Sequence, residues 1–201
     1  MNKLFEQYEN LSKEDLQKYL YDACEKGELD KVKYLVNSPE LAVHADVLCQ
    51  EGQALIDAVY NNQFEIVDYL LNSDELKENI NIHTCNDFAI IQACENGDTE
   101  MVKFLLTSPK LKEHSDIYTK GNHLISARPF LMAYICEQME VLEYLILEYK
   151  IEYNDAIKYI LNGDRKEITP ILENMFKNRE IHSELKEELN IGILKNKKLK
   201  L

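Results

Sequence analysis

Hydrophobic residues recur along the chain at the spacing of an α-helix. Two stretches share the pattern i, i+3, i+6, i+7, with apolar positions Leu29, Val32, Leu35 and Val36 in one and Phe64, Val67, Leu70 and Leu71 in the other. Such positions lie along one side of a helix, which has about 3.6 residues per turn. The pattern therefore predicts short amphipathic helices, each with one apolar stripe that packs against a neighbouring element.

A second type of amphipathic stretch precedes each of these helices. Each contains an alanine and ends near a glycine or an asparagine, as in Ala23 with Gly27, Ala58 with Asn62 and Ala93 with Gly97. Glycine and asparagine accept the left-handed conformation that ends many helices. Ser12 is a suitable N-cap for the first stretch, which predicts a helix from Lys13 to Lys26. The chain is thus predicted to form pairs of helices.

The helix pairs belong to a sequence repeat with a period of 35 residues. Residues 22–38 (DACEKGELDKVKYLVNS) recur as residues 57–73 (DAVYNNQFEIVDYLLNS) and as residues 92–108 (QACENGDTEMVKFLLTS). A fourth copy, residues 132–146, follows after 40 residues, which implies an insertion between Tyr118 and Arg128. A degraded fifth copy covers residues 157–176. A fixed period of about 20 to 50 residues is the signature of stacked structural repeats.

This pattern predicts an all-α fold, a helical repeat solenoid of stacked antiparallel helix pairs, with about five repeats and helical caps. The repeats are expected at residues 18–52, 53–87, 88–126, 127–152 and 153–178, between caps at residues 1–17 and 179–190. Leu4, Phe5, Tyr8 and Leu11 keep helical spacing and are expected to cover the first repeat. Residues 191–201 contain four lysines and no acidic residue, which predicts a basic, flexible tail.

The connectors between repeats also recur, and they place His44 and His114 at the same position two repeats apart. Repeats stacked at helix-packing distances of about 8 to 10 Å would hold these two rings about 20 Å apart. A zinc–nitrogen bond is about 2 Å long, so the two histidines cannot share a metal ion. Each is expected to form a hydrogen bond within its own connector.

Composition narrows the range of functions. The 201-residue chain has 23 Lys and Arg against 36 Asp and Glu, a net charge of −13, and 45% hydrophobic residues. The hydrophobic content is sufficient for a folded core, whereas the negative charge opposes direct binding to nucleic-acid phosphates. No apolar run approaches the roughly 20 residues of a membrane-spanning helix, and no secretion signal is visible. A cytoplasmic protein with five reduced cysteines and no membrane partner is therefore expected.

The sequence lacks the motifs of common catalytic and cofactor sites. It has no nucleophile elbow, no Walker-type glycine loop and no His/Cys cluster with metal-ligand spacing. We therefore expect no enzyme activity, no cofactor, no metal site and no small-molecule substrate. The aromatic series Tyr34, Tyr69, Phe104 and Tyr144 lies beside the apolar stripes, which favours packing over base stacking.

The repeat resembles the ankyrin repeat, whose pattern is A-A-x-x-G-x-x-E-I-V-K-L-L-L. The matching segments are ACEKGELDKVKYLV and ACENGDTEMVKFLL, and the resemblance covers about residues 18–176. In place of the family's T-P-L-H-L segment the copies carry QALID, FAIIQ and RPFLM. The family's Thr and His tie neighbouring turns together, so these ties are expected to be missing. The 35-residue period and the connectors look like the divergent arrays of bacteria and large DNA viruses.

The family resemblance implies a concave binding face made by the ends of the first helices and the tips of the connectors. The matching positions at the helix ends are Glu25, Lys26, Tyr60, Asn61, Glu95, Asn96, Ile135 and Cys136, and those at the connector tips are Glu51, Asn86 and Asp87. Tyr60 is the expected hot spot, because a large amphipathic ring buries much area at a small entropy cost.

Two functions fit this surface. The first is a non-enzymatic scaffold or adaptor for another protein, or an effector that binds a host protein in the host cytoplasm. The alternative is an acidic inhibitor that mimics nucleic acid and occupies the basic groove of a nucleic-acid-binding protein. Steep weakening of the complex by salt would favour the inhibitor, since charge-dominated association is screened by ions.

Overall fold

The computed structural model describes residues 5–119, 128–152 and 170–180, and all regular secondary structure in these residues is helical. The chain divides into two compact units, Met1–Val141 and Leu142–Leu201. The helix pairs of the first unit are α1 (Lys13–Lys26) with α2 (Leu29–Asn37), α3 (Cys49–Tyr60) with α4 (Phe64–Asn72), and α5 (Thr84–Asn96) with α6 (Thr99–Thr107). They are preceded by η1 (Glu6–Tyr8) and followed by α7 (Arg128–Ile135) and α8 (Met139–Glu143), which crosses the unit boundary.

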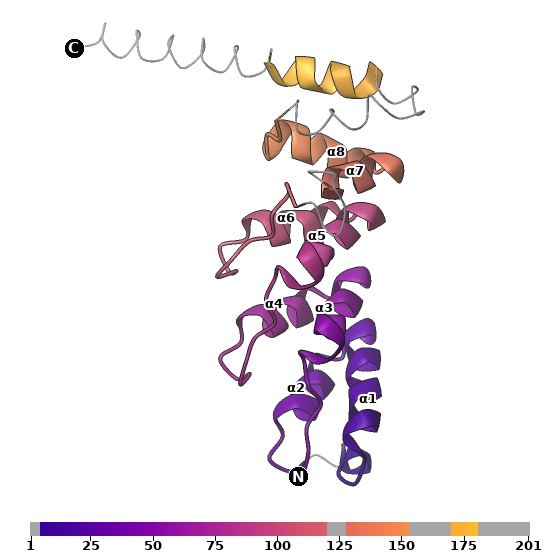
Figure 1. Cartoon of the computed structure of the whole chain (residues 1–201), viewed down its shortest axis with the longest axis vertical. Helices are drawn as coiled ribbons and strands as arrows, with labels where there is room; N and C mark the ends of the chain where they lie inside the picture. The colour runs from indigo at the N-terminus through magenta and orange to yellow at the C-terminus, as the bar shows by residue number, and fades with distance from the viewer. Residues whose placement is uncertain (1–4, 120–127, 153–169, 181–201) are drawn as a thin grey trace, which may run out of the picture. The chain divides into compact units, whose positions relative to one another are not determined.

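Figure 1 shows the first helices of these pairs, α1, α3 and α5, in one row and the second helices, α2, α4 and α6, in a row beside them. Each first helix contacts the next one, α1 with α3, α3 with α5 and α5 with α7. The predicted all-α solenoid of stacked helix pairs is confirmed. The insertion expected before Arg128, most of the fifth copy and the basic tail lie outside the described residues.

Helix α1 begins and ends at the predicted residues. The Ser12 hydroxyl accepts a hydrogen bond from the Asp15 N–H (3.1 Å), which satisfies one of the unpaired donors of the first turn. Gly27 ends the helix in the left-handed conformation, with φ 77°. Gly97 ends α5 in the same way, and Asn62 follows α3 with φ 59°. The helix ends predicted from residue type alone are therefore confirmed.

The apolar stripes of the second helices form the core of the stack. Val32, Leu35, Val67 and Leu70 are fully buried, and Val36 and Leu71 are nearly so. The aromatic series also packs: Tyr69 is buried, and Phe104 lies against Phe64 with ring centroids 5.8 Å apart. The stripes thus bury the flanks that a single helix pair would leave in water.

The connectors repeat one hydrogen-bonding arrangement after each second helix. The carbonyls of Ser38, Ser73 and Ser108 contact the side chains of His44 (Nε2, 2.8 Å), Asn79 (Nδ2, 2.9 Å) and His114 (Nε2, 2.9 Å), respectively. The predicted role of the two histidines in their own connectors is confirmed. Asparagine serves equally well at this position because the contact needs one nitrogen near a carbonyl oxygen.

Aromatic residues before α1 cover the start of the stack. Phe5 and Tyr8 are buried, and the Phe5 ring lies 4.8 Å from that of Tyr34 in α2. The expected cap is confirmed for these two residues. In the second unit, η2 (Tyr144–Glu148) is a π-helical turn, and residues 170–180 are helical. Within that unit, Arg179 Nη1 donates to the Ile151 carbonyl at 2.7 Å.

Candidate partner-binding surface

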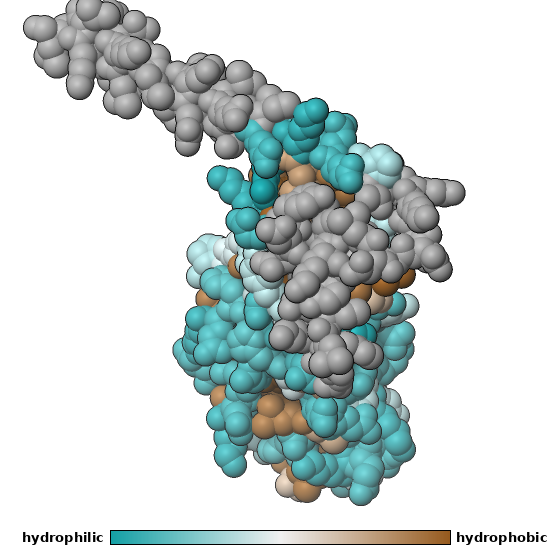
Figure 2. Space-filling model, turned by 45° about the horizontal axis from the view of Figure 1, so that its top comes forward, coloured by the Kyte–Doolittle hydropathy of each residue, from teal (hydrophilic) through white to brown (hydrophobic). Residues whose placement is uncertain are grey.

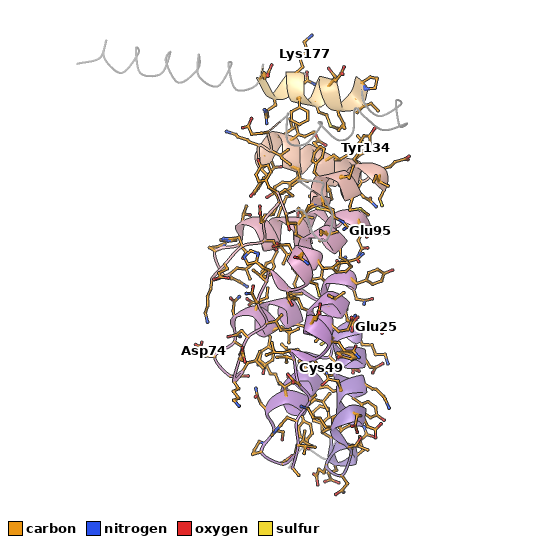
Figure 3. The ribbon with its side chains drawn as sticks, in the orientation of Figure 1. Glu25, Cys49, Asp74, Glu95, Tyr134 and Lys177 are labelled. Carbon is orange, nitrogen blue, oxygen red and sulfur yellow. The ribbon has the colours of Figure 1, made fainter. Side chains whose placement is uncertain are left out.

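The last turns of the first helices expose one side chain per repeat at matching positions. We call Glu25, Tyr60, Glu95 and Ile135 the end row. Tyr60 is 59% exposed and Ile135 37%, the Glu25 side chain is exposed, and Glu95 is half-buried. Figure 3 shows Glu25 and Glu95 on one side of the first unit and Asp74, in a connector, on the opposite side. The structure therefore brings the predicted helix-end residues into one row.

Residues next to the end row are partly engaged in local contacts. Lys26 pairs with Asp22 one turn earlier, and the Asn61 amide donates to the Asp57 carbonyl at 2.9 Å. Asn96 is exposed, but its amide oxygen accepts from Gln92 (3.0 Å). Cys136 is half-buried after α7. Lys26 and Asn96 are therefore exposed, but their side chains already form local contacts.

Side chains of neighbouring repeats hold the backbone of the end row in place. Gln63 Nε2 donates to the Glu25 carbonyl (3.1 Å), and Gln138 Nε2 donates to the Glu95 carbonyl (2.8 Å). At the junction between them, Asn96 Nδ2 donates to the Tyr60 carbonyl at 3.2 Å. These bonds fix the backbone carbonyls and leave the Glu25 and Tyr60 side chains exposed, which is a preorganised arrangement for binding.

The connector tips have an unusual backbone. Three consecutive residues are left-handed at the start of α3 (Gln50, Glu51 and Gly52) and again at the start of α5 (Cys85, Asn86 and Asp87), with φ between 50° and 82°. Glu51 and Asn86 are exposed at these tips. Left-handed backbone in residues other than glycine is costly and persists only when surrounding contacts fix it.

The expectation that Asp87 is exposed at a connector tip is wrong, because the residue is only 6% exposed. Its Oδ1 atom accepts hydrogen bonds from the Asp116 N–H (3.1 Å) and lies 2.7 Å from His83 Nδ1. The carboxylate is therefore turned inward and links its connector to the next one. A buried polar group is usually satisfied in this way, and Asp87 is not available to a partner.

The ties expected to be missing between connectors are supplied by other residues. Gln17 binds the next connector twice, donating to the Asp46 carbonyl (2.9 Å) and accepting from the Asp46 N–H (2.8 Å). Thr84 and Thr119, 35 residues apart, donate to the carbonyls of Glu51 and Asn86. Sequence reasoning missed these residues, although the matching spacing of the two threonines was a usable signal.

The helix-end and connector-tip residues lie at opposite ends of the first helices. Helix α3 is regular from Gln53 to Tyr60, a rise of about 10 Å, and Glu51 lies before this stretch. A partner that contacts both groups would therefore have to cross the face of α3. The two groups consequently form two separate rows, and the end row is the more exposed.

Negative charge is concentrated on the central repeats. Residues 34–102 contain 13 Asp and Glu and a single basic residue, Lys77, so that they carry −12 of the net −13. Burial raises the pKa of Asp57 in α3, and the charge of Glu25 adds to this effect. In Figure 2 the visible face outside the grey residues is mainly hydrophilic, with small hydrophobic patches.

Two of the five cysteines, Cys24 and Cys94, are buried in the helix stack. All five are unpaired thiols, as the sequence predicted, and burial raises the pKa of Cys24 to about 12 and raises that of Cys94 as well. A thiol with a raised pKa is a poor nucleophile and a poor metal ligand. In the described parts of the chain no three His, Cys, Asp or Glu side chains converge to hold a metal ion. The described helices also include none long and apolar enough to cross a membrane.

Stacked antiparallel helix pairs with a 35-residue period define this chain as a helical repeat protein. Residues 2–84 match the family model described as ankyrin repeats (3 copies). Residues 2–84 therefore contain ankyrin repeats, and the helix pairs continue past residue 84 in the same register. Ankyrin repeats are protein–protein interaction modules. Comparisons with curated proteins and with solved structures found no significant match.

Proposed function

We propose that the chain is a non-catalytic scaffold or adaptor that binds another protein through the end row. One observation carries this proposal: neighbouring repeats fix the backbone carbonyls of Glu25, Tyr60 and Glu95, while Tyr60 remains 59% exposed. A rigid backbone that presents exposed aromatic and charged side chains lowers the entropy lost on binding. The family binds its partners through a concave face, which suits a folded protein. If the chain is an effector, this partner would be a protein in the host cytoplasm.

Partner capture with a double variant tests this surface. Tyr60→Ala with Glu95→Ala should reduce capture of protein from the native cell's lysate, because truncating a central aromatic anchor typically costs about 2 kcal/mol or more of binding free energy. Val43→Ala with Glu65→Ala is the matched control, since it also removes one exposed apolar side chain and one exposed acid. Quantitative mass spectrometry measures capture, and thermal unfolding checks the fold. Equal capture by both variants would remove the end row as the binding surface.

The nucleic-acid mimic is a second candidate, favoured by the net charge of −12 in residues 34–102. If it is correct, a captured partner should be released by added duplex DNA or by single-stranded RNA, which would compete for the same basic groove. A partner that stays bound in excess nucleic acid would instead support the adaptor.

A further inference from the structure

The central first helices lack basic side chains entirely. Neither α3 nor α5 contains Lys or Arg, whereas together they carry four acidic residues, Glu51, Asp57, Asp87 and Glu95. The second helices differ, because α2 and α6 interleave Lys31, Lys33 and Lys103 with their acidic residues. The negative potential of the first-helix side is therefore not offset by cations on α3 and α5.

Three exposed or half-exposed side chains lie on this side of the first two repeats. Asp57 and Tyr60 are three residues apart and so share a face of α3, and Glu25 occupies in α1 the position that Tyr60 occupies in α3. Helices α1 and α3 pack against each other. Burial raises the pKa of Asp57, and the charge of Glu25 adds to this rise. Glu95 takes the same position in the following repeat, so the Tyr60 ring has carboxylates on both sides along the stack.

The carboxylates at this junction have no cation of their own. Asp57 accepts one hydrogen bond, from Gln53 Nε2 (2.8 Å), and within the described residues neither Asp57 nor Glu25 forms an ion pair. Lys26, next to Glu25, pairs with Asp22 instead. Two like charges held near each other without a counterion repel, and a bound cation would relieve that repulsion.

We infer that Glu25, Asp57 and Tyr60 form a receptor for a basic side chain, arginine in preference to lysine, on a partner protein. A guanidinium group can stack on an aromatic face while its N–H donors pair with carboxylates, and both contacts are available here. The inference rests on the proposed function, because it assigns the chemistry of the partner to the same surface. It predicts a partner with an exposed, arginine-rich segment.

A labelled peptide, (Arg-Ser-Gly)4, provides the probe, and fluorescence anisotropy with the full-length chain at low salt measures its binding. Glu25→Gln with Asp57→Asn should weaken binding about tenfold, since two charge-assisted contacts are lost. The control, Glu65→Gln with Asp68→Asn on α4, changes the net charge equally and should weaken binding less than about twofold. Equal loss in the two variants would show a general charge effect and overturn the receptor.

The ring is tested separately. Tyr60→Leu should weaken peptide binding about fivefold, whereas Tyr60→Phe should restore nearly all of it, because the aromatic face rather than the hydroxyl holds the cation. The peptide (Lys-Ser-Gly)4 should bind less tightly than the arginine peptide. The inference would be refuted if the Tyr60→Leu variant bound the peptide as tightly as the wild type does, or if the wild type showed no detectable binding.

The two proposals fail in different ways. If the end-row variant loses partner capture but the peptide tests fail, the end row is supported as the binding surface and a basic ligand is rejected. Peptide binding that depends on Glu25, Asp57 and Tyr60, combined with unchanged partner capture, would keep the receptor and reject the end row as the site of capture.

Discussion

The two ends of the first helices are linked to their neighbours in different ways. At the connector end, side chains such as Gln17 and Asp87 turn inward and bind the next connector, and both are buried. At the opposite end, the links run from Gln63, Asn96 and Gln138 to backbone carbonyls. The connector end also has links to backbone carbonyls, from Thr84 and Thr119. It adds buried side chains of its own to these links, whereas the other end leaves Glu25 and Tyr60 exposed.

This difference shows how a repeat protein can vary its surface without losing its stacking. A link to a backbone carbonyl does not depend on the identity of the residue that supplies the carbonyl. Tyr60 differs in side chain from Glu25 and Glu95, and yet all three backbone carbonyls accept a hydrogen bond from a side-chain amide of a neighbouring repeat. Substitutions should consequently affect folding at the connector end and binding at the end row.

The largest effect is expected for Asp87→Ala at the connector end. The change removes the acceptor for the Asp116 N–H and the partner of His83, and loss of hydrogen bonds to a buried charged group costs about 2 to 3 kcal/mol. The free energy of unfolding in urea, followed by circular dichroism, measures the loss. Glu65→Ala, at an exposed position in α4, is the control and should change it by less than about 0.5 kcal/mol. Similar values for the two variants would contradict a structural role for Asp87.

A smaller effect is expected for Gly27→Ala at the other end. Gly27 has φ 77°, and a Cβ atom there would collide with the Oε1 and Cδ atoms of the Gln63 side-chain amide. The strain and the lost hydrogen bond to the Glu25 carbonyl together should cost about 1 to 2 kcal/mol.

A double-mutant cycle separates these two contributions. Gln63→Ala alone should cost about 1 kcal/mol, and in that background Gly27→Ala should cost only the backbone strain, about 1 kcal/mol or less. The double variant should then lose less free energy of unfolding than the sum of the two single variants. Strict additivity in urea unfolding would show that Gln63 does not contact the turn at Gly27.

Much of the fold could be predicted from sequence because it depends on residue type and period. Ser12, Gly27 and Gly97 mark helix ends through local backbone chemistry, and the apolar stripe of α4 follows from spacing alone. The contacts of His44 and His114 were predictable for the same reason, since the whole arrangement lies within one connector.

The candidate site was less predictable because it depends on contacts between repeats. Asp87 was expected at an exposed tip, yet its burial follows from a hydrogen bond to Asp116 in the next connector. The left-handed residues 50–52 and 85–87 include Gly52, Asn86 and Asp87, types that tolerate this backbone, but also Gln50, Glu51 and Cys85, so residue type alone did not predict three such residues in a row. The end row, in contrast, was found from its variation at matched repeat positions.

The smallest effect is expected where the connector end itself is strained. Glu51 has φ 55°, a conformation that glycine adopts without steric cost. Glu51→Gly should therefore stabilise the chain, by about 0.5 kcal/mol after allowing for the greater freedom of glycine in the unfolded state. Glu51→Ala keeps the strain and should give no gain in urea unfolding. Asn86→Gly should gain less than Glu51→Gly, because asparagine tolerates left-handed backbone better than glutamate does. If Glu51→Gly instead destabilised the chain as a glycine in a helix does, the left-handed turn at Glu51 would be wrong, and the connector end would not be strained at this residue.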